Sequence, residues 1–178
     1  TKINIGDFAP FFVKGTRLEG LLSGNIEIKD PFGYLSIDAV AEAEQFRLNN
    51  DSIGRLSLHP NYSKAAGMVS FSAAADNKDY NFTAEGLYDL ADSSDRELDI
   101  AVHLTNARIH PLENYIGHLF SRLDGEASGN FRITGPVNKL KYLGDIELVN
   151  GGLQVDYTRC YYRIPHASFR FRDGYIDF

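Results

Sequence analysis

Apolar and polar residues alternate with a period of two along most of this chain, a pattern typical of strands with one apolar face. Residues 14–29 show it clearly: leucine, isoleucine and glycine share one face, and glutamate and lysine occupy the other. The alternation recurs near residues 34–40, 69–75, 80–86, 98–105, 131–134, 142–148 and 167–171. Polar turns separate these runs, and Asp173-Gly174 is a strong hairpin signal. Breaks are expected at His59-Pro60-Asn61 and at Asn150-Gly151-Gly152. The chain is therefore predicted to be mainly β.

One segment departs from this pattern and predicts a helix. Pro111 stands where a helix could start, and Gly125 suits its C-terminal cap. The apolar residues between them follow helical spacing: Leu112, Ile116, Leu119, Phe120 and Leu123. We expect one short amphipathic helix over residues 111–123, plugging the end of a β core. A mobile lid or a partner-binding helix is the alternative.

Two architectures fit strands that have one apolar face. Two sheets can pack their apolar faces together as a sandwich. A single sheet can instead curl around its own apolar face and leave a trough. Glycines on the apolar face favour the curled sheet, because they permit strong curvature or close approach of neighbouring strands. These glycines are Gly20, Gly24, Gly86, Gly129 and Gly144.

A faint internal repeat suggests how the chain is organised. Residues 24–32 and 129–137 both begin with Gly-Asn, continue with alternating residues and end near a proline. Self-similar β units of this kind suggest an array in which each unit covers the edge of the next. The chain starts at Thr1 and ends within an alternating run, so we interpret residues 1–178 as a fragment of a longer β-rich repeat protein. Two subunits, residues 1–108 and 109–178, are an alternative description.

Charge and reactive residues point away from catalysis and nucleic acid. A net charge of −6 argues against broad nucleic-acid binding, because binding a phosphate backbone needs a basic surface. The single cysteine, Cys160, excludes an internal disulfide. The five histidines lack metal-ligand spacing, so no metal or other cofactor is expected. Tyrosines and arginines in residues 157–163 could bind sugars or anions, although tyrosine is also common in strands. No acid, base and nucleophile constellation stands out, so the chain is not expected to be an enzyme.

The last third of the chain carries a family resemblance. Gly125, Ala127, Gly129, Phe131, Ile133 and Gly135-Pro136 are followed by Gly144, Ile146, Leu148, Asn150-Gly151-Gly152, Leu153 and Val155. This succession resembles the C-terminal region of the TamB family, the inner-membrane subunit of the translocation and assembly module and part of the AsmA-like superfamily. The resemblance implies a long, curved, antiparallel-type β-sheet folded like a taco around a hydrophobic groove.

The resemblance also implies a location and partners. The full-length protein would be anchored in the inner membrane of a diderm bacterium and would extend through the periplasm. Its partner would be a TamA-like outer-membrane barrel of the Omp85 type. Its function would be phospholipid transport to the outer membrane, assistance to outer-membrane β-barrel assembly, or both. The sequence does not choose between lipid and nascent barrel protein as the cargo.

A hypothesis for the binding site follows from the alternation and the resemblance together. A groove would shield acyl chains from water, and exposed strand edges could instead pair with a substrate strand. The residues expected to line the groove are Leu18, Leu22, Ile26, Ile28, Ile100, Val102, Leu104, Phe131, Ile133, Ile146, Leu148, Phe169 and Phe171. The alternatives are a closed core made of the same side chains, and a β-sandwich module for surface binding or adhesion.

Overall fold

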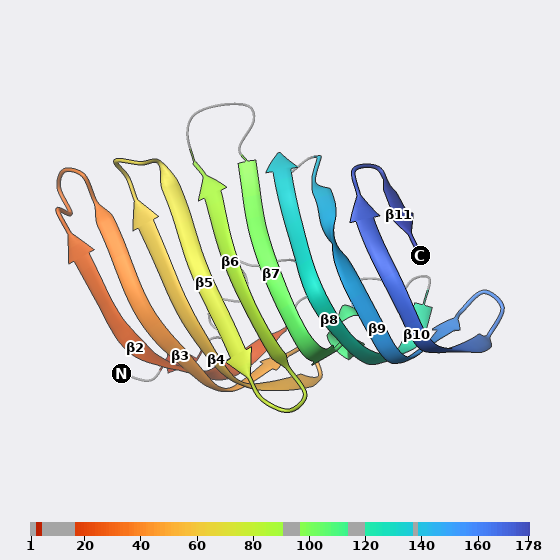
Figure 1. The fold of residues 1–178 in the computed structure, drawn as a ribbon. Coiled ribbons are helices and arrows are strands. Elements are labelled where there is room, and N and C mark those ends of the chain that lie inside the picture. The colour runs from red at the N-terminus through yellow and green to blue at the C-terminus, as the bar shows by residue number, and fades with distance from the viewer. Residues whose placement is uncertain (1–2, 5–16, 91–96, 114–119, 137–138) are drawn as a thin grey trace.

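The computed structural model describes residues 3–4, 17–90, 97–113, 120–136 and 139–178. Eleven strands form one sheet in which every neighbouring pair is antiparallel and the spatial order equals the sequence order (Figure 1). The strands are β1 (Ile3–Asn4), β2 (Leu18–Lys29), β3 (Ser36–Leu48), β4 (Asp51–Ser63), β5 (Met68–Asp76), β6 (Asn81–Asp89), β7 (Glu97–Arg108), β8 (Phe120–Pro136), β9 (Lys141–Val155), β10 (Cys160–Arg172) and β11 (Tyr175–Asp177). The prediction of a mainly β chain is confirmed, and the described strands form one open sheet rather than two packed sheets.

Short turns explain why several strands pair with the next one in sequence. After β2, Asp30 has a positive φ of 45°, the Gly33 amide donates to the Asp30 carbonyl at 3.2 Å, and the Tyr34 amide donates to the Asp30 carboxylate at 2.7 Å. Asn49, with a φ of 57°, stands in the tight turn between β3 and β4. Asparagine and aspartate tolerate this left-handed conformation better than most residues do. Local turn chemistry therefore directs a meander.

The strands bend close to one of their ends, where extra residues interrupt the pairing. Gln45 in β3, Asn106 in β7, Arg122 in β8 and Asn150 in β9 all have φ values between 50° and 52°, and the register shifts beside each of them. Such bulges bend a strand and increase its twist. The lower ends of the strands curve out of the plane of the sheet in Figure 1. Bulges in β3, β7, β8 and β9 therefore contribute to the bend of the sheet.

Buried apolar side chains are concentrated near this bend. One cluster joins residues near the bend in β2, β3 and β4 to the end of β5 and to the residue just before β6: Leu18, Ala43, Phe46, Ile53, Leu56, Ala75 and Tyr80. On β7 to β9 the buried apolar residues are Ala107, Leu123, Ala127 and Leu148. Fully burying one large apolar side chain contributes about 1.5–3 kcal/mol, so the bend is the most stabilised part of the described fold.

The helix predicted for residues 111–123 is absent from the part of this range that the structure describes. A single turn of 3₁₀ helix, η2 (His110–Leu112), contains Leu112, which is largely exposed. Phe120 and Leu123 belong to β8, where Phe120 pairs with Val155. The bulge at Arg122 resets the alternation of the strand, so a three-residue spacing that imitates a helix arises within β8. The predicted plug residues Ile116 and Leu119 lie outside the described residues.

Both expected breaks also lie within strands. Asn150-Gly151-Gly152 forms a bulge inside β9 rather than a turn. Pro60 lies in the middle of β4, opposite Phe71 of β5. The pairing of β4 with β3 is interrupted between Leu58 and Asn61, so the missing N–H of the proline costs no ladder hydrogen bond there.

Candidate binding surface

Register aligns the apolar residues of the sheet into continuous rows. One row crosses every strand from β2 to β10 and contains no polar side chain. Its members are Gly24, Ala41, Leu58, Ala73, Ala84, Val102, Phe131, Gly144 and Phe171. Strand side chains alternate between faces, so residues directly opposite one another share a face. We call this side of the sheet the apolar face.

Parallel rows widen the apolar face on both sides of the first row. Toward the bend, one row consists of Ala75, Phe82, Leu104, Gly129, Ile146 and Phe169. Away from the bend, another consists of Pro60, Phe71, Gly86, Ile100, Ile133 and Tyr142. Most of these side chains are only half-buried among the described residues. The sheet therefore presents a broad apolar surface with residual exposure.

The opposite face of the sheet is polar, and its charges are largely paired. A neighbouring row there consists of Ser23, Glu42, Ser57, Ala74, Thr83, His103, Asn130, Asp145 and Arg170. His103 Nδ1 lies 2.9 Å from Asn130 Oδ1, and the Arg132 guanidinium forms a two-pronged pair with the Asp99 carboxylate. Hydrogen bonding to Arg132 lowers the pKa of Asp99. The same hydrogen bond raises the pKa of Arg132. The two faces thus differ sharply in chemistry.

Glycines allow the large side chains of the apolar face to meet across an intervening strand. Gly144 of β9 lies between Phe131 of β8 and Phe171 of β10, and the two rings meet edge to face with centroids 5.0 Å apart. Gly86 lies directly beside the Phe71 ring, because a Cβ at Gly86 would stand 2.1 Å from a ring carbon. The glycine pattern noted in the sequence therefore corresponds to close approach of this kind.

The structure brings most of the predicted groove residues together on the apolar face. Register places the predicted residues of β7 to β10 side by side there: Ile100 opposite Ile133, Val102 opposite Phe131, and Ile146 opposite Phe169. Leu148 is buried near the bend, and Leu18 lies in the buried cluster. Ile26 and Ile28 of β2 are on the same face but are 67% and 58% exposed, and β3 to β6 separate them from β7.

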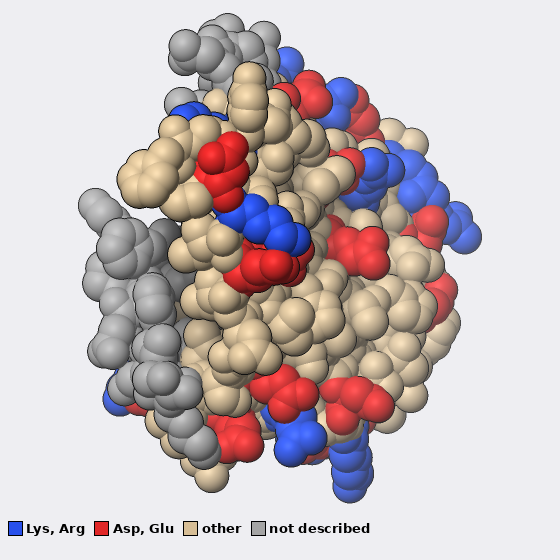
Figure 2. Space-filling model, turned by 90° about the vertical axis from the view of Figure 1, so that its left-hand side faces the viewer, with Lys and Arg blue, Asp and Glu red and all other residues tan. Residues whose placement is uncertain are grey.

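Both long outer strands have open edges within the described part of the chain. β1 pairs with β2 only at Leu21 and Leu22, and β11 pairs with β10 only at residues 170–172. No described strand lies beside the remaining outer edges of β2 and β10. Seen from the β2 side, charged side chains form separate groups between stretches of uncharged surface (Figure 2). These edges expose backbone groups that another strand could pair with.

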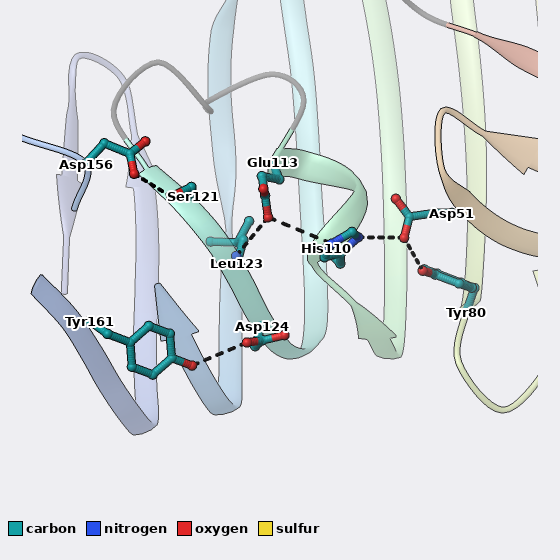
Figure 3. A network of polar contacts seen from close by, with 9 residues as sticks. All are labelled: Asp51, Tyr80, His110, Glu113, Ser121, Leu123, Asp124, Asp156 and Tyr161. Carbon is teal, nitrogen blue, oxygen red and sulfur yellow. Dashed lines mark hydrogen bonds and ion pairs between the residues drawn. The ribbon is translucent and has the colours of Figure 1, made fainter. Parts of the chain in front are cut away.

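A polar network at the bend was not predicted from the sequence. His110, which follows β7, reaches Asp51 at the start of β4, with Nδ1 2.7 Å from Oδ1 (Figure 3). The Tyr80 hydroxyl donates to the same oxygen at 3.2 Å. Glu113 lies 3.8 Å from His110 Nε2 and accepts the Leu123 amide at 3.0 Å. Since 59 residues separate Asp51 from His110, no local spacing in the sequence signals the pair.

Burial strongly shifts the pKa of one side chain in this network, Tyr80. Desolvation first, and then the adjacent Asp51 carboxylate, raise the pKa of Tyr80 to about 12. Both causes favour the neutral phenol, which keeps its proton to donate to Asp51. Tyr80 therefore serves as a fixed hydrogen-bond donor at neutral pH.

The tyrosine-rich hairpin between β9 and β10 makes its own contacts. The Tyr161 hydroxyl donates to Asp124 at 3.3 Å, and the Arg122 guanidinium lies 5.4 Å from the Tyr161 ring centroid. Tyr157 is almost completely exposed. Tyr161 thus helps to anchor the bulged end of β8, a structural role that the sequence left open.

Comparison of the chain with protein-family models, with curated proteins and with solved structures finds no match. Among the described residues there is no helix with the length and apolar character needed to cross a bilayer. Functional proposals for this chain therefore rest on its own surface chemistry and on the resemblance noted in its sequence.

Proposed function

We propose that this chain is a non-enzymatic, TamB-like segment whose apolar face shields lipid acyl chains from water. The observation that carries the proposal is the row from Gly24 to Phe171, which crosses β2 to β10 without a polar side chain. Sealed cores also have apolar rows, but most members of this row are only half-buried within the described part of the chain. Contiguous apolar surfaces that remain partly exposed are typical of binding sites.

The chemistry of the surface suits a long hydrocarbon. Each methylene transferred from water contributes about 0.8 kcal/mol, so burying about ten methylenes would contribute about 8 kcal/mol before ordering costs are subtracted. Aliphatic and aromatic side chains are spread over many strands, and no position dominates. A chain could therefore slide from one row to the next with little change in free energy. Transport along the sheet, rather than storage in one pocket, follows from such uniformity.

The cellular setting is part of the same proposal. The resemblance to TamB supports a periplasmic location, an inner-membrane anchor in the full-length protein, and an outer-membrane barrel of the Omp85 type as partner. The polar face supports exposure to an aqueous compartment, because its cross-strand pairs, such as Arg172 with Asp145 at 2.7 Å, satisfy its charges without a partner protein.

Native mass spectrometry of the purified protein tests lipid binding directly. We expect phospholipid to co-purify with the wild type and to be lost from Ile133→Asp, which places a charge in the apolar face. Thr134→Asp is the matched control, because Thr134 pairs with Asp99 and Lys141 on the polar face. Circular dichroism verifies that both variants fold. Lipid retained by a folded Ile133→Asp protein would reject this surface as the lining.

The open edges favour a second candidate function, assistance to outer-membrane β-barrel assembly by strand addition. The outer edges of β2 and β10 are long, and no described strand covers most of their length. Main-chain hydrogen bonds would provide affinity for an incoming strand. Hydrogen exchange with an added outer-membrane strand peptide should protect amides of residues 23–29 or 160–169. Unchanged exchange of the amides at both edges in the presence of the peptide would contradict strand addition.

A further inference from the structure

The hairpin between β9 and β10 is basic, although the chain as a whole is acidic. The chain has 24 acidic and 18 basic side chains, yet residues 157–172 contain four arginines and no aspartate or glutamate. Arg170 and Arg172 of this hairpin lie on the polar face and pair with carboxylates. The other two, Arg159 and Arg163, belong to the end of the hairpin, which projects from the bend beyond the rest of the sheet (Figure 1).

The arginines at this end of the hairpin have no acidic partner. Among the described residues, four arginines form no ion pair, and three of them lie around Tyr161. The Arg122 guanidinium lies 5.4 Å from the Tyr161 ring centroid, and Arg159 and Arg163 stand two residues on either side of Tyr161. All three arginines are exposed. The fourth, Arg55, is on β4.

The two carboxylates beside these arginines already accept hydrogen bonds from neutral groups. The Tyr161 hydroxyl donates to Asp124 at 3.3 Å, and the Ser121 hydroxyl donates to Asp156 (Figure 3). Gln154 also donates to Asp156, at 3.4 Å. The three arginines outnumber these two carboxylates, so this end of the molecule is positive although the whole chain carries −6. The unpaired guanidinium groups favour an anionic partner.

Exposed tyrosines accompany the arginines. Tyr157 is 97% exposed, Tyr162 is 50% exposed and Tyr161 is 42% exposed. A tyrosine side chain has an apolar ring and a polar hydroxyl, so it is enriched where lipid headgroups meet hydrocarbon. Arginines beside it are attracted to the negative surface of a membrane that contains anionic lipids. Together these side chains match the chemistry of such a surface.

The hairpin end is continuous with the apolar face along β10. The pairing of β9 with β10 has no register shift, so Phe171, Phe169, Ala167, Arg163 and Tyr161 point to one side of the strand. The first three belong to the apolar side of the sheet, and the last two belong to the hairpin end. A lipid that leaves a bilayer at the hairpin end would therefore meet the apolar face next.

We infer that the hairpin end, formed by residues 157–163 together with Arg122, docks onto the surface of an anionic phospholipid bilayer. The tyrosine rings lie among the headgroups, and the guanidinium groups contact lipid phosphates. Because the chain is acidic overall, an anionic surface repels much of the remaining molecule, and docking is therefore oriented. A role of docking in lipid uptake rests on the proposed function, whereas docking itself requires no acyl-chain binding.

Vesicle flotation of the purified protein tests this docking. We expect the wild type to float with vesicles of equimolar phosphatidylcholine and phosphatidylglycerol, and not with vesicles of phosphatidylcholine alone. Arg159→Gln and Arg163→Gln should each weaken the partition about fivefold, the effect of losing one cation near an anionic surface. Tyr157→Ser should weaken it without any loss of charge. Arg55→Gln is the matched control, because it removes an equally exposed and unpaired arginine from β4 and should leave the partition unchanged.

The single cysteine of the chain allows a direct test of which surface docks, because Cys160 is exposed within the hairpin end. The emission of a polarity-sensitive fluorophore on Cys160 should shift to shorter wavelength when anionic vesicles are added. The control combines Cys160→Ser with Ala65→Cys, which moves the label to an exposed turn between β4 and β5, at the far end of the strands from the bend. No shift is expected there. Vesicle binding with a shift at position 65 and none at position 160 would overturn the inference.

The outcomes separate this inference from the proposed function. Docking is overturned if the wild type does not float with anionic vesicles, floats equally with both kinds of vesicle, or binds undiminished as Arg159→Gln and Arg163→Gln. Ile133→Asp should float normally even though it loses co-purified lipid. Co-purified lipid without flotation would overturn docking and leave acyl-chain shielding intact. Flotation of a wild type from which no lipid co-purifies would instead overturn the proposed function and leave docking intact.

Discussion

Gly144 should be among the positions of this sheet least tolerant of a larger side chain. It lies near the β10 end of the apolar row, between Phe131 and Phe171, with a φ of 144°. A Cβ there would stand 2.2 Å from the Asn130 carbonyl oxygen and 2.8 Å from the Phe131 Cα. Both obstacles are backbone atoms of β8, so no side-chain rotation can relieve the overlap.

The cost of Gly144→Ala has two parts. An L-residue in this region of φ adds about 1–3 kcal/mol of strain. The overlap also forces β8 and β9 apart around the Asn130–Asp145 and Phe131–Gly144 pairs, and each ladder hydrogen bond lost there costs about 0.5–1.5 kcal/mol. We expect a total of about 3–5 kcal/mol, a large share of the 5–15 kcal/mol typical of a folded domain.

Gly174→Ala is the matched control for this prediction. Gly174 also has a positive φ, 86°, but nothing lies within 4 Å of the position its Cβ would take. This variant should be destabilised only by the added backbone strain, about 1–2 kcal/mol. Urea denaturation followed by circular dichroism measures both losses. Equal destabilisation by the two substitutions would refute the argument that β8 and β9 approach unusually closely at Gly144.

Three further predictions concern titration and the bend. Because the folded state raises the pKa of Tyr80 to about 12 from about 10 in an unfolded chain, the resulting stability is complete below pH 10 and is lost toward pH 12. Denaturation across this range should show a decrease of at most about 2–3 kcal/mol, and Tyr80→Phe should remove this dependence. In Arg132→Gln, an NMR titration should show the pKa of Asp99 rising toward its ordinary value; an unchanged midpoint would contradict the hydrogen-bond explanation. Asn150→Val should cost about 1–2 kcal/mol at its φ of 52°, whereas Asn150→Gly should be nearly neutral by urea denaturation.

Period-two alternation predicted much of this fold because burial on one face imposes it directly on the sequence. The strands around Phe71, Val102 and Ile133 lie where the alternation places them. The hairpin at Asp173-Gly174 also agrees with its turn chemistry, and Gly174 has the positive φ that such a turn requires.

Bulges and interrupted pairing explain why the predicted helix and the two predicted strand breaks were wrong. At Arg122 and Asn150 an extra residue breaks the alternation without ending the strand, so one bulge imitated a helix and the other a turn. Pro60 reads as a strand break, and only the register with β3 shows that its missing donor has no consequence. These outcomes depend on the neighbouring strand, which local sequence does not specify.

The sequence likewise predicts one part of the candidate site and not the other. The apolar face could be predicted, since alternation marks its members strand by strand. The polar network around Asp51 could not, because Asp51, Tyr80 and His110 are distant in sequence and meet only at the bend. The sole sequence signal was an aspartate at a turn that becomes buried after folding.

Photo-crosslinking from the two faces of β7 tests the central claim most directly. A benzophenone amino acid at Val102 would stand on the apolar face opposite Phe131, and one at Ala101 would stand on the polar face opposite Arg132. With phospholipid bound, we predict crosslinks to acyl chains from position 102 and none from position 101. Equal crosslinking from both positions, or crosslinking from position 101 alone, would contradict the account of an apolar face that carries lipid.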